Sequence, residues 1–169
     1  SMTAISPGGI SANVFIACSP FFEFIIKDKL GLMSTVSKFG FPENCIHAIM
    51  ENMNIQQQIE NFIPQTPAQA KAKAAMLAAW QNDGEKLLSR QAEAAHFTAS
   101  AFILNPAMDK TLMVHHNIYQ SFGWTGGHAD GEADLLAVAL REAQEETGIQ
   151  QIYPLSGAVL SLDALAVPA

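Results

Sequence analysis

The chain has 169 residues, which leaves room for one domain and an additional segment and is long enough to bury a sizeable core. Hydrophobic residues make up 49% and charged residues 15% of the sequence, a composition that excludes a largely disordered chain. The formal net charge of -7 argues against a nucleic-acid backbone as the main partner, because proteins that bind one carry basic patches.

Residues 1–52 are apolar and mostly helix-prone. Ser19 and Pro20 suit the N-cap and the first position of a helix that would end near Gly31, and Pro42 could open a second helix. We therefore predict a helical extension over residues 1–52, with no chemical role assigned to it.

No membrane segment and no cysteine motif is predicted in this extension. The apolar run from Val14 to Ile26 is interrupted by Pro20 and Glu23, so it matches neither a membrane span nor a signal peptide. The sequence has 2 cysteines, Cys18 and Cys45, which fit no zinc-binding spacing. We expect two free thiols in a reducing compartment, which indicates a cytoplasmic protein.

Residues 53–95 carry stronger helix signals. Thr66 and Gln69 form a capping box around Pro67, and the alanine-rich stretch that follows would end at Gly84. A second short helix is expected directly after it. The predicted unit is a helical hairpin packed beside the main domain, and the alternative is a protein-interaction surface on a degenerate domain.

Residues 96–169 change to strand and turn signals. Strands are predicted over 97–104, 111–115 and 152–162, and a helix is predicted over 134–147. A strand, strand, loop, helix, strand order predicts an α+β domain with a mixed sheet and a helix packed on it.

The predicted helix is acidic on one side. Asp134 is a good N-cap and Gly148 a good C-terminal stop, and Glu142, Glu145 and Glu146 fall within an arc of about 100°. Glu142 and Glu146 are one turn apart, where like charges oppose helix formation by a few tenths of a kcal/mol. A divalent cation between them would remove that cost, and carboxylate oxygens suit Mg²⁺ or Mn²⁺. A solvated acidic face is the alternative.

The loop before the helix favours the metal site. Gly126 and Gly127 allow the backbone to approach a phosphate or a metal closely, because no side chain intervenes. His128 follows them and is a candidate for phosphate contact, or else an ordinary loop residue. His115 and His116 are adjacent on a predicted strand and point to opposite faces, which does not suit a two-histidine metal site.

This pattern resembles the Nudix box: a glycine, five residues, a glutamate, seven residues, then Arg-Glu-apolar-x-Glu-Glu-x-Gly-apolar. Gly127 takes the first position, and the later positions are filled in register by Arg141, Glu142, Ala143, Glu145, Glu146, Gly148 and Ile149. Chance agreement at the glycines, the arginine and the three glutamates is on the order of one in 10⁵. The fold implied by the resemblance is a Nudix-like α/β/α sandwich.

The resemblance implies a hydrolase that uses Mg²⁺ or Mn²⁺ to cut a pyrophosphate bond in a nucleoside diphosphate linked to another group. Glu142, Glu146 and Gly127 would bind the metal, and Gly126, Gly127 and His128 would bind a small nucleotide substrate. The pattern leaves open which nucleotide derivative is cut. The alternative function is a nucleotide-binding or regulatory module that does not hydrolyse its ligand.

The catalytic set implied by the resemblance is Glu142, Glu145 and Arg141, with Glu142 as a candidate general base. Ala133 stands where the family has a glutamate that commonly pairs with the arginine. Glu145 and Glu132 are therefore the candidate partners of Arg141.

Nudix domains continue beyond the point in the fold at which this sequence ends, so we expect the C-terminal part of the sheet to be missing. An unfinished sheet would expose a strand edge, which is an aggregation hazard. We expect residues 1–52, or a second copy in a homodimer, to cover that edge.

Overall fold

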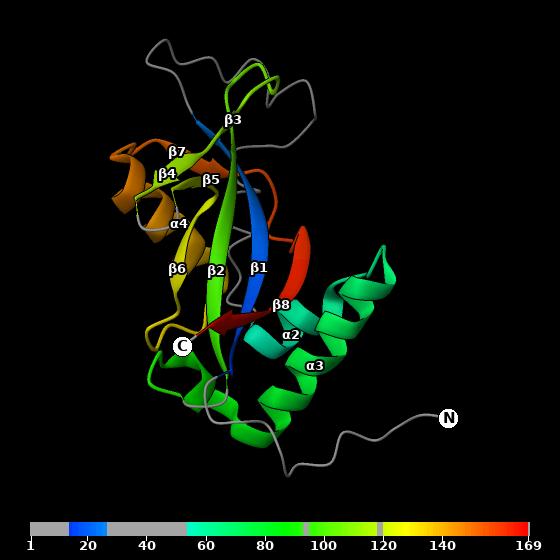
Figure 1. The fold of residues 1–169 in the computed structure, drawn as a ribbon. Coiled ribbons are helices and arrows are strands. Elements are labelled where there is room, and N and C mark those ends of the chain that lie inside the picture. The colour runs from blue at the N-terminus through cyan, green and yellow to red at the C-terminus, as the bar shows by residue number, and fades with distance from the viewer. Residues whose placement is uncertain (1–13, 27–53, 93–94, 118–119, 169) are drawn as a thin grey trace.

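The computed structural model describes residues 14–26, 54–92, 95–117 and 120–168, with the backbone alone for 14–26 and 166–168 (Figure 1). A six-stranded sheet contains β1 (Val14–Ile26), β2 (Ala95–Leu104), β3 (Thr111–Leu112), β6 (Thr125–His128), β7 (Ile152–Pro154) and β8 (Ser161–Pro168). A two-stranded sheet contains β4 (Val114–His116) and β5 (Ser121–Gly123). The helices are α2 (Ile55–Asn61), α3 (Pro67–Asp83), the 3-10 helix η2 (Gly84–Leu88) and α4 (Leu135–Thr147).

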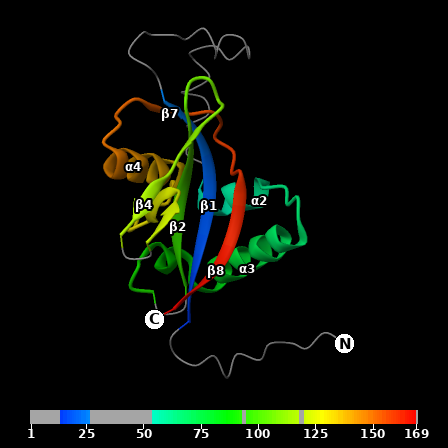
Figure 2. The same cartoon turned by 45° about the horizontal axis from the view of Figure 1, so that its top comes forward.

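The large sheet is mixed, as predicted. β1 is parallel to β2 and antiparallel to both β7 and β8, while β3 and β6 pair antiparallel with the other edge of β2. Figure 2 shows β1 between β2 and β8, with α3 beside β8. Helices packed on a mixed sheet confirm the α+β class.

The prediction of a helix within residues 1–52 is wrong for Val14–Ile26, which form the strand β1. This run is rich in β-branched and aromatic residues, and those residues favour a strand that is paired on both sides. Pro20 lies within the strand. The register with β2 pairs Cys18 and next Phe21, and it leaves out the positions between them, consistent with the missing N–H donor of proline. Part of the extension therefore does join the sheet, as a central strand and not as a cover on its edge.

The other residues named in the predictions for this extension, including Gly31, Pro42 and Cys45, lie outside the described residues.

The hairpin helices begin at well-capped N-termini. The Thr66 hydroxyl accepts the Gln69 N–H at 3.2 Å, but the Gln69 side chain accepts the Gln65 N–H and does not complete the predicted box. A complete capping box is found instead at Asn54 and Gln57, where α2 begins. The short helix expected after the alanine-rich helix is the 3-10 helix η2, which ends at Leu88.

One hydrophobic core joins the hairpin to the sheet and α4. The fully buried side chains include Ile55 and Ile59 of α2, Met76 of α3 and Leu87 of η2. Burial of these apolar side chains within the chain argues against the interpretation of the hairpin as an interaction surface on a degenerate domain.

The described helices α3 and α4 pack on the same face of the sheet. On β2, the Phe97 ring meets Trp80 of α3 edge-on, with ring centroids 6.1 Å apart. Two residues further along the same face, Ala99 pairs with Gly127, which adjoins Glu142 of α4. In the described residues, no helix is long and apolar enough to cross a membrane.

Candidate metal and nucleotide site

The acidic helix begins and ends where the sequence predicts. The Asp134 side chain accepts the N–H groups of Leu136 and Ala137 at 3.0 and 3.2 Å, which caps the N-terminus of α4. Gly148 ends the helix in the left-handed conformation, with φ of 71°. The helix is therefore fixed at both ends, and its glutamates have defined positions relative to the sheet.

The glycine strand β6 lies directly against α4. A Cβ atom at Gly127 would overlap the Glu142 carboxylate, and one at Gly126 would overlap Ser100 on β2. Gly126 therefore requires glycine, because backbone atoms of β2 are in the way, whereas at Gly127 the obstacle is the end of the flexible Glu142 side chain. The close approach brings the Gly127 backbone and the Glu142 carboxylate together.

Glu146 is held against the same strand. Its carboxylate accepts the Gly126 N–H at 3.2 Å. The pKa of Glu146 is raised, first by the partial burial of its otherwise exposed carboxylate and further by the negative charge of Glu142. The Gly126 hydrogen bond and His116 act in the opposite direction. Two interacting carboxylates beside a glycine backbone are an arrangement that a cation would stabilise.

Arg141 connects the helix to the end of the glycine strand. Its Nη2 donates to the His128 carbonyl and to Glu142 Oε1, both at 2.9 Å. The expectation that Arg141 pairs with Glu145 or Glu132 is wrong. Glu132 instead accepts the Asp134 N–H at 2.9 Å, so the loop before α4 occupies it.

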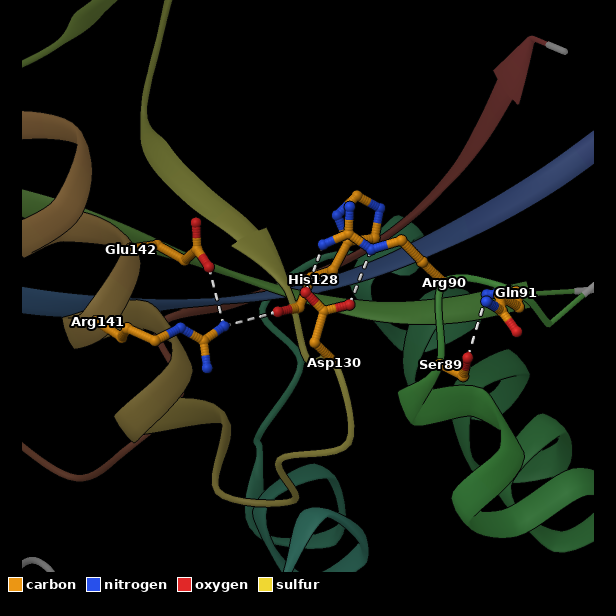
Figure 3. Close-up of polar contacts among 7 residues, drawn as sticks. All are labelled: Ser89, Arg90, Gln91, His128, Asp130, Arg141 and Glu142. Atoms are coloured by element: carbon orange, nitrogen blue, oxygen red, sulfur yellow. Dashed lines mark hydrogen bonds and ion pairs between the residues drawn. The ribbon is translucent and has the colours of Figure 1, made fainter.

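The turn after β6 carries a second ion pair. Arg90 donates from Nε to Asp130 Oδ1 at 2.9 Å and from Nη2 to the other carboxylate oxygen. Figure 3 shows Asp130 between Arg90 on one side and the His128 carbonyl with Arg141 on the other. The bond to Arg90 is the main cause that lowers the pKa of Asp130, and the charges of Arg90, His128 and Arg141 add to it.

A pair of histidine rings adjoins this turn. His96 on β2 is buried, and its ring lies 4.9 Å from the His128 ring. The pKa of His96 is lowered, first by burial and then by the nearby positive charges of His128 and Arg90. The role of His128 in binding phosphate remains a prediction.

Two carboxylates, those of Glu142 and Glu146, lie beside the glycine backbone, and oxygen donors of this kind suit a divalent cation. The described segments contain no group of three or more His, Cys, Asp or Glu side chains arranged to hold a metal. The fit rests instead on the Glu142 carboxylate beside Gly127 and the Glu146 carboxylate at the Gly126 N–H. Burial is the main cause that raises the pKa of Glu146, and the negative charge of Glu142 adds to it. Glu145 is exposed on the same helix, and its catalytic role remains a prediction.

Sequence reasoning missed Arg90, Asp130, His96 and the approach of His116 to Glu146. Asp130-Gly131 is a turn signal, but nothing in the sequence indicates its partner forty positions earlier. Trp124 packs on Phe102, with ring centroids 4.8 Å apart.

No curated protein matches the chain. Residues 94–162 match the family model of the NUDIX domain. The matched segment runs from β2 into β8 and includes the glycine strand, the turn and the acidic helix. Residues 94–162 therefore form a NUDIX domain within the chain.

Proposed function

We propose that the chain is a pyrophosphohydrolase that depends on Mg²⁺ or Mn²⁺ and cuts a nucleoside diphosphate linked to another group. The observation that carries this proposal is the contact of Gly126 and Gly127 with two glutamates one helical turn apart. Glu142, Glu146 and the Gly127 carbonyl would hold the cation. In sites of this kind a divalent cation neutralises phosphate charge and makes water more acidic.

The chain's own residues would orient the substrate and accept a proton. Gly126, Gly127 and His128 would place the diphosphate along β6, where the two glycines carry no side chain that would keep it away from the backbone. Glu142 is the candidate base: it would take a proton from the attacking water as a P–O bond of the pyrophosphate breaks. Arg141 would hold Glu142 in place, and Glu145 would assist from the exposed side of α4.

A nucleotide-binding module without hydrolysis is the second candidate. It is favoured by the bond from Arg141 to Glu142, which occupies one oxygen of a proposed ligand, and by Ala133 in place of the family's glutamate. The unbroken pattern from Arg141 to Glu146 favours the hydrolase.

The first test is calorimetric titration of Mg²⁺ and Mn²⁺ into the full chain, its Glu142→Gln/Glu146→Gln variant and a Glu85→Gln control. Glu85 lies on η2, outside the proposed site, and undergoes the same chemical change. We expect saturable binding in the wild type and the control, at least about 100-fold weaker in the double variant because both charged ligands are lost. A wild type that binds no cation would contradict the proposed metal site.

A panel of nucleotide sugars, ADP-ribose, dinucleoside polyphosphates and coenzyme A then separates the two functions. Turnover of one compound that is lost in Glu146→Gln, while the variant keeps its fold, supports the hydrolase. Cation and nucleotide binding without turnover supports the binding module.

We also propose that the protein is cytoplasmic and that it forms a homodimer. The support for the location is the absence of any recognised cysteine motif in the sequence. Sedimentation of the purified chain over a concentration series tests the dimer.

A further inference from the structure

We propose that Arg90 and Asp130 are a positioning pair, which fixes the turn between β6 and α4 and thereby sets Arg141 and Glu142 for cation binding. The inference rests on the proposed function of this site. It assigns a role to the end of the helical hairpin, which precedes the matched NUDIX segment.

Two neighbouring residues of the turn are held by the end of the hairpin. Arg90 contacts both carboxylate oxygens of Asp130, a two-bond geometry that fixes orientation as well as distance (Figure 3). The next residue, Gly131, donates its N–H to the Leu88 carbonyl at 3.0 Å. The hairpin therefore restrains both a side chain and the backbone of the turn.

The turn has a conformation that needs such restraint. Asp130 has φ of 50° and Gly131 has φ of 93°, so two successive residues lie in the region that disfavours most side chains. Aspartate tolerates this region better than most residues, but the conformation still has a cost that neighbouring contacts must offset. The buried Ala129 anchors the start of the turn through its N–H bond to the Phe97 carbonyl, at 3.1 Å.

The restrained turn is continuous with the proposed metal site. The His128 carbonyl, two residues before Asp130, accepts from Arg141, and the same Arg141 atom donates to Glu142. Movement of the turn would therefore move the acceptor that orients Arg141. Ala133 cannot supply the negative charge that the family pattern places near this arginine, whereas Asp130 lies close enough to Arg141 for their charges to interact.

The pair is too exposed to serve mainly as a stabilising contact. The side chains of Arg90 and Asp130 are 58% and 40% exposed, and ion pairs this accessible contribute little to stability. A positioning role therefore predicts a change in cation affinity with little change in melting temperature.

The test measures Mn²⁺ affinity by calorimetry for the full chain carrying Asp130→Asn, Arg90→Gln, both changes, or Arg90→Lys. Asparagine keeps the shape of aspartate and its tolerance of positive φ. Asp109→Asn is the matched control, because Asp109 lies in another exposed turn and also accepts a side-chain hydrogen bond. We expect about tenfold weaker binding in each single variant, no further loss in the double variant, partial recovery in Arg90→Lys, and an unchanged control.

The sign of the Arg90→Gln effect separates positioning from simple electrostatics. Removing a positive charge near a cation site would strengthen Mn²⁺ binding if only the charge mattered. Weaker binding in Arg90→Gln therefore supports positioning, and equal or stronger binding overturns it.

Hydrogen exchange of the amides of residues 126–131 in the metal-free protein gives a readout that does not depend on the metal. We expect faster exchange in Asp130→Asn and Arg90→Gln than in the wild type or the Asp109→Asn control. If the wild type binds no Mn²⁺, the proposed function fails and exchange alone decides: faster exchange supports the restraint, and unchanged exchange overturns it.

Discussion

Two regions of this chain meet at one turn, and they contribute to it in different ways. The β6–α4 region supplies contacts between residues close in sequence, such as Arg141 with Glu142 and with His128. The hairpin supplies Arg90, which reaches a residue forty positions later, and a set of buried apolar side chains. The first region carries the polar groups of the site, while the second contributes mainly to the core and restrains the site from outside.

The largest expected effect is a loss of stability when a buried side chain of the hairpin is truncated. Met76 on α3 is fully buried in the common core, so Met76→Ala should lower the free energy of unfolding by about 2–5 kcal/mol. Ile63→Ala is the control, because Ile63 is 75% exposed and its truncation should change stability by less than about 0.5 kcal/mol. Urea denaturation measures both. A cost similar to the control would show that the hairpin is not part of the core.

An intermediate effect is expected from the closest contact between strand and helix. Gly127→Ala places a Cβ where the Glu142 carboxylate lies, so the end of that flexible side chain must move, at a cost of at most about 1 kcal/mol. Cation binding should weaken with it, since a proposed ligand is displaced. Gly123→Ala is the matched control, because nothing lies within 4 Å of the added methyl group. Equal melting temperatures and equal cation affinities in the two variants would contradict the packing described here.

The same contrast explains how much the sequence could predict. The bounds of α4 follow from Asp134 and Gly148, because caps act within one turn of the chain, and the glycine–glutamate contact follows from a motif in a single loop and helix. A helix is predicted for β1 because Ser19-Pro20 resembles a helix start, whereas the strand depends on pairing with β2 about eighty positions later and with β8 at least 140 positions later. Arg90 was missed for the same reason. Local signals do not encode such partners.

The smallest expected effect is a change in stability on replacing Glu146, one of the two proposed metal ligands on α4. In the metal-free protein the pKa of Glu146 is raised, so its ionised form is less favourable in the folded state than in the unfolded chain. Glu146→Gln should therefore raise the free energy of unfolding at neutral pH, by a few tenths of a kcal/mol because the side chain is exposed. The glutamine oxygen can still accept the Gly126 N–H, so that bond need not be lost.

The effect of Glu146 on the free energy of unfolding depends on pH, and the direction of its pKa shift fixes the sign. The folded protein binds the Glu146 proton more tightly than the unfolded chain does, so the destabilisation by Glu146 is fully present above its raised pKa. It vanishes as the pH falls below the ordinary value of 4.5, where both states are protonated. The advantage of Glu146→Gln over the wild type should disappear across that range in thermal unfolding measured without metal, while Glu85→Gln shows no such trend. A variant less stable than the wild type at neutral pH would mean that Glu146 supports the fold by its charge, and that the acidic side of α4 is not strained in the absence of a cation.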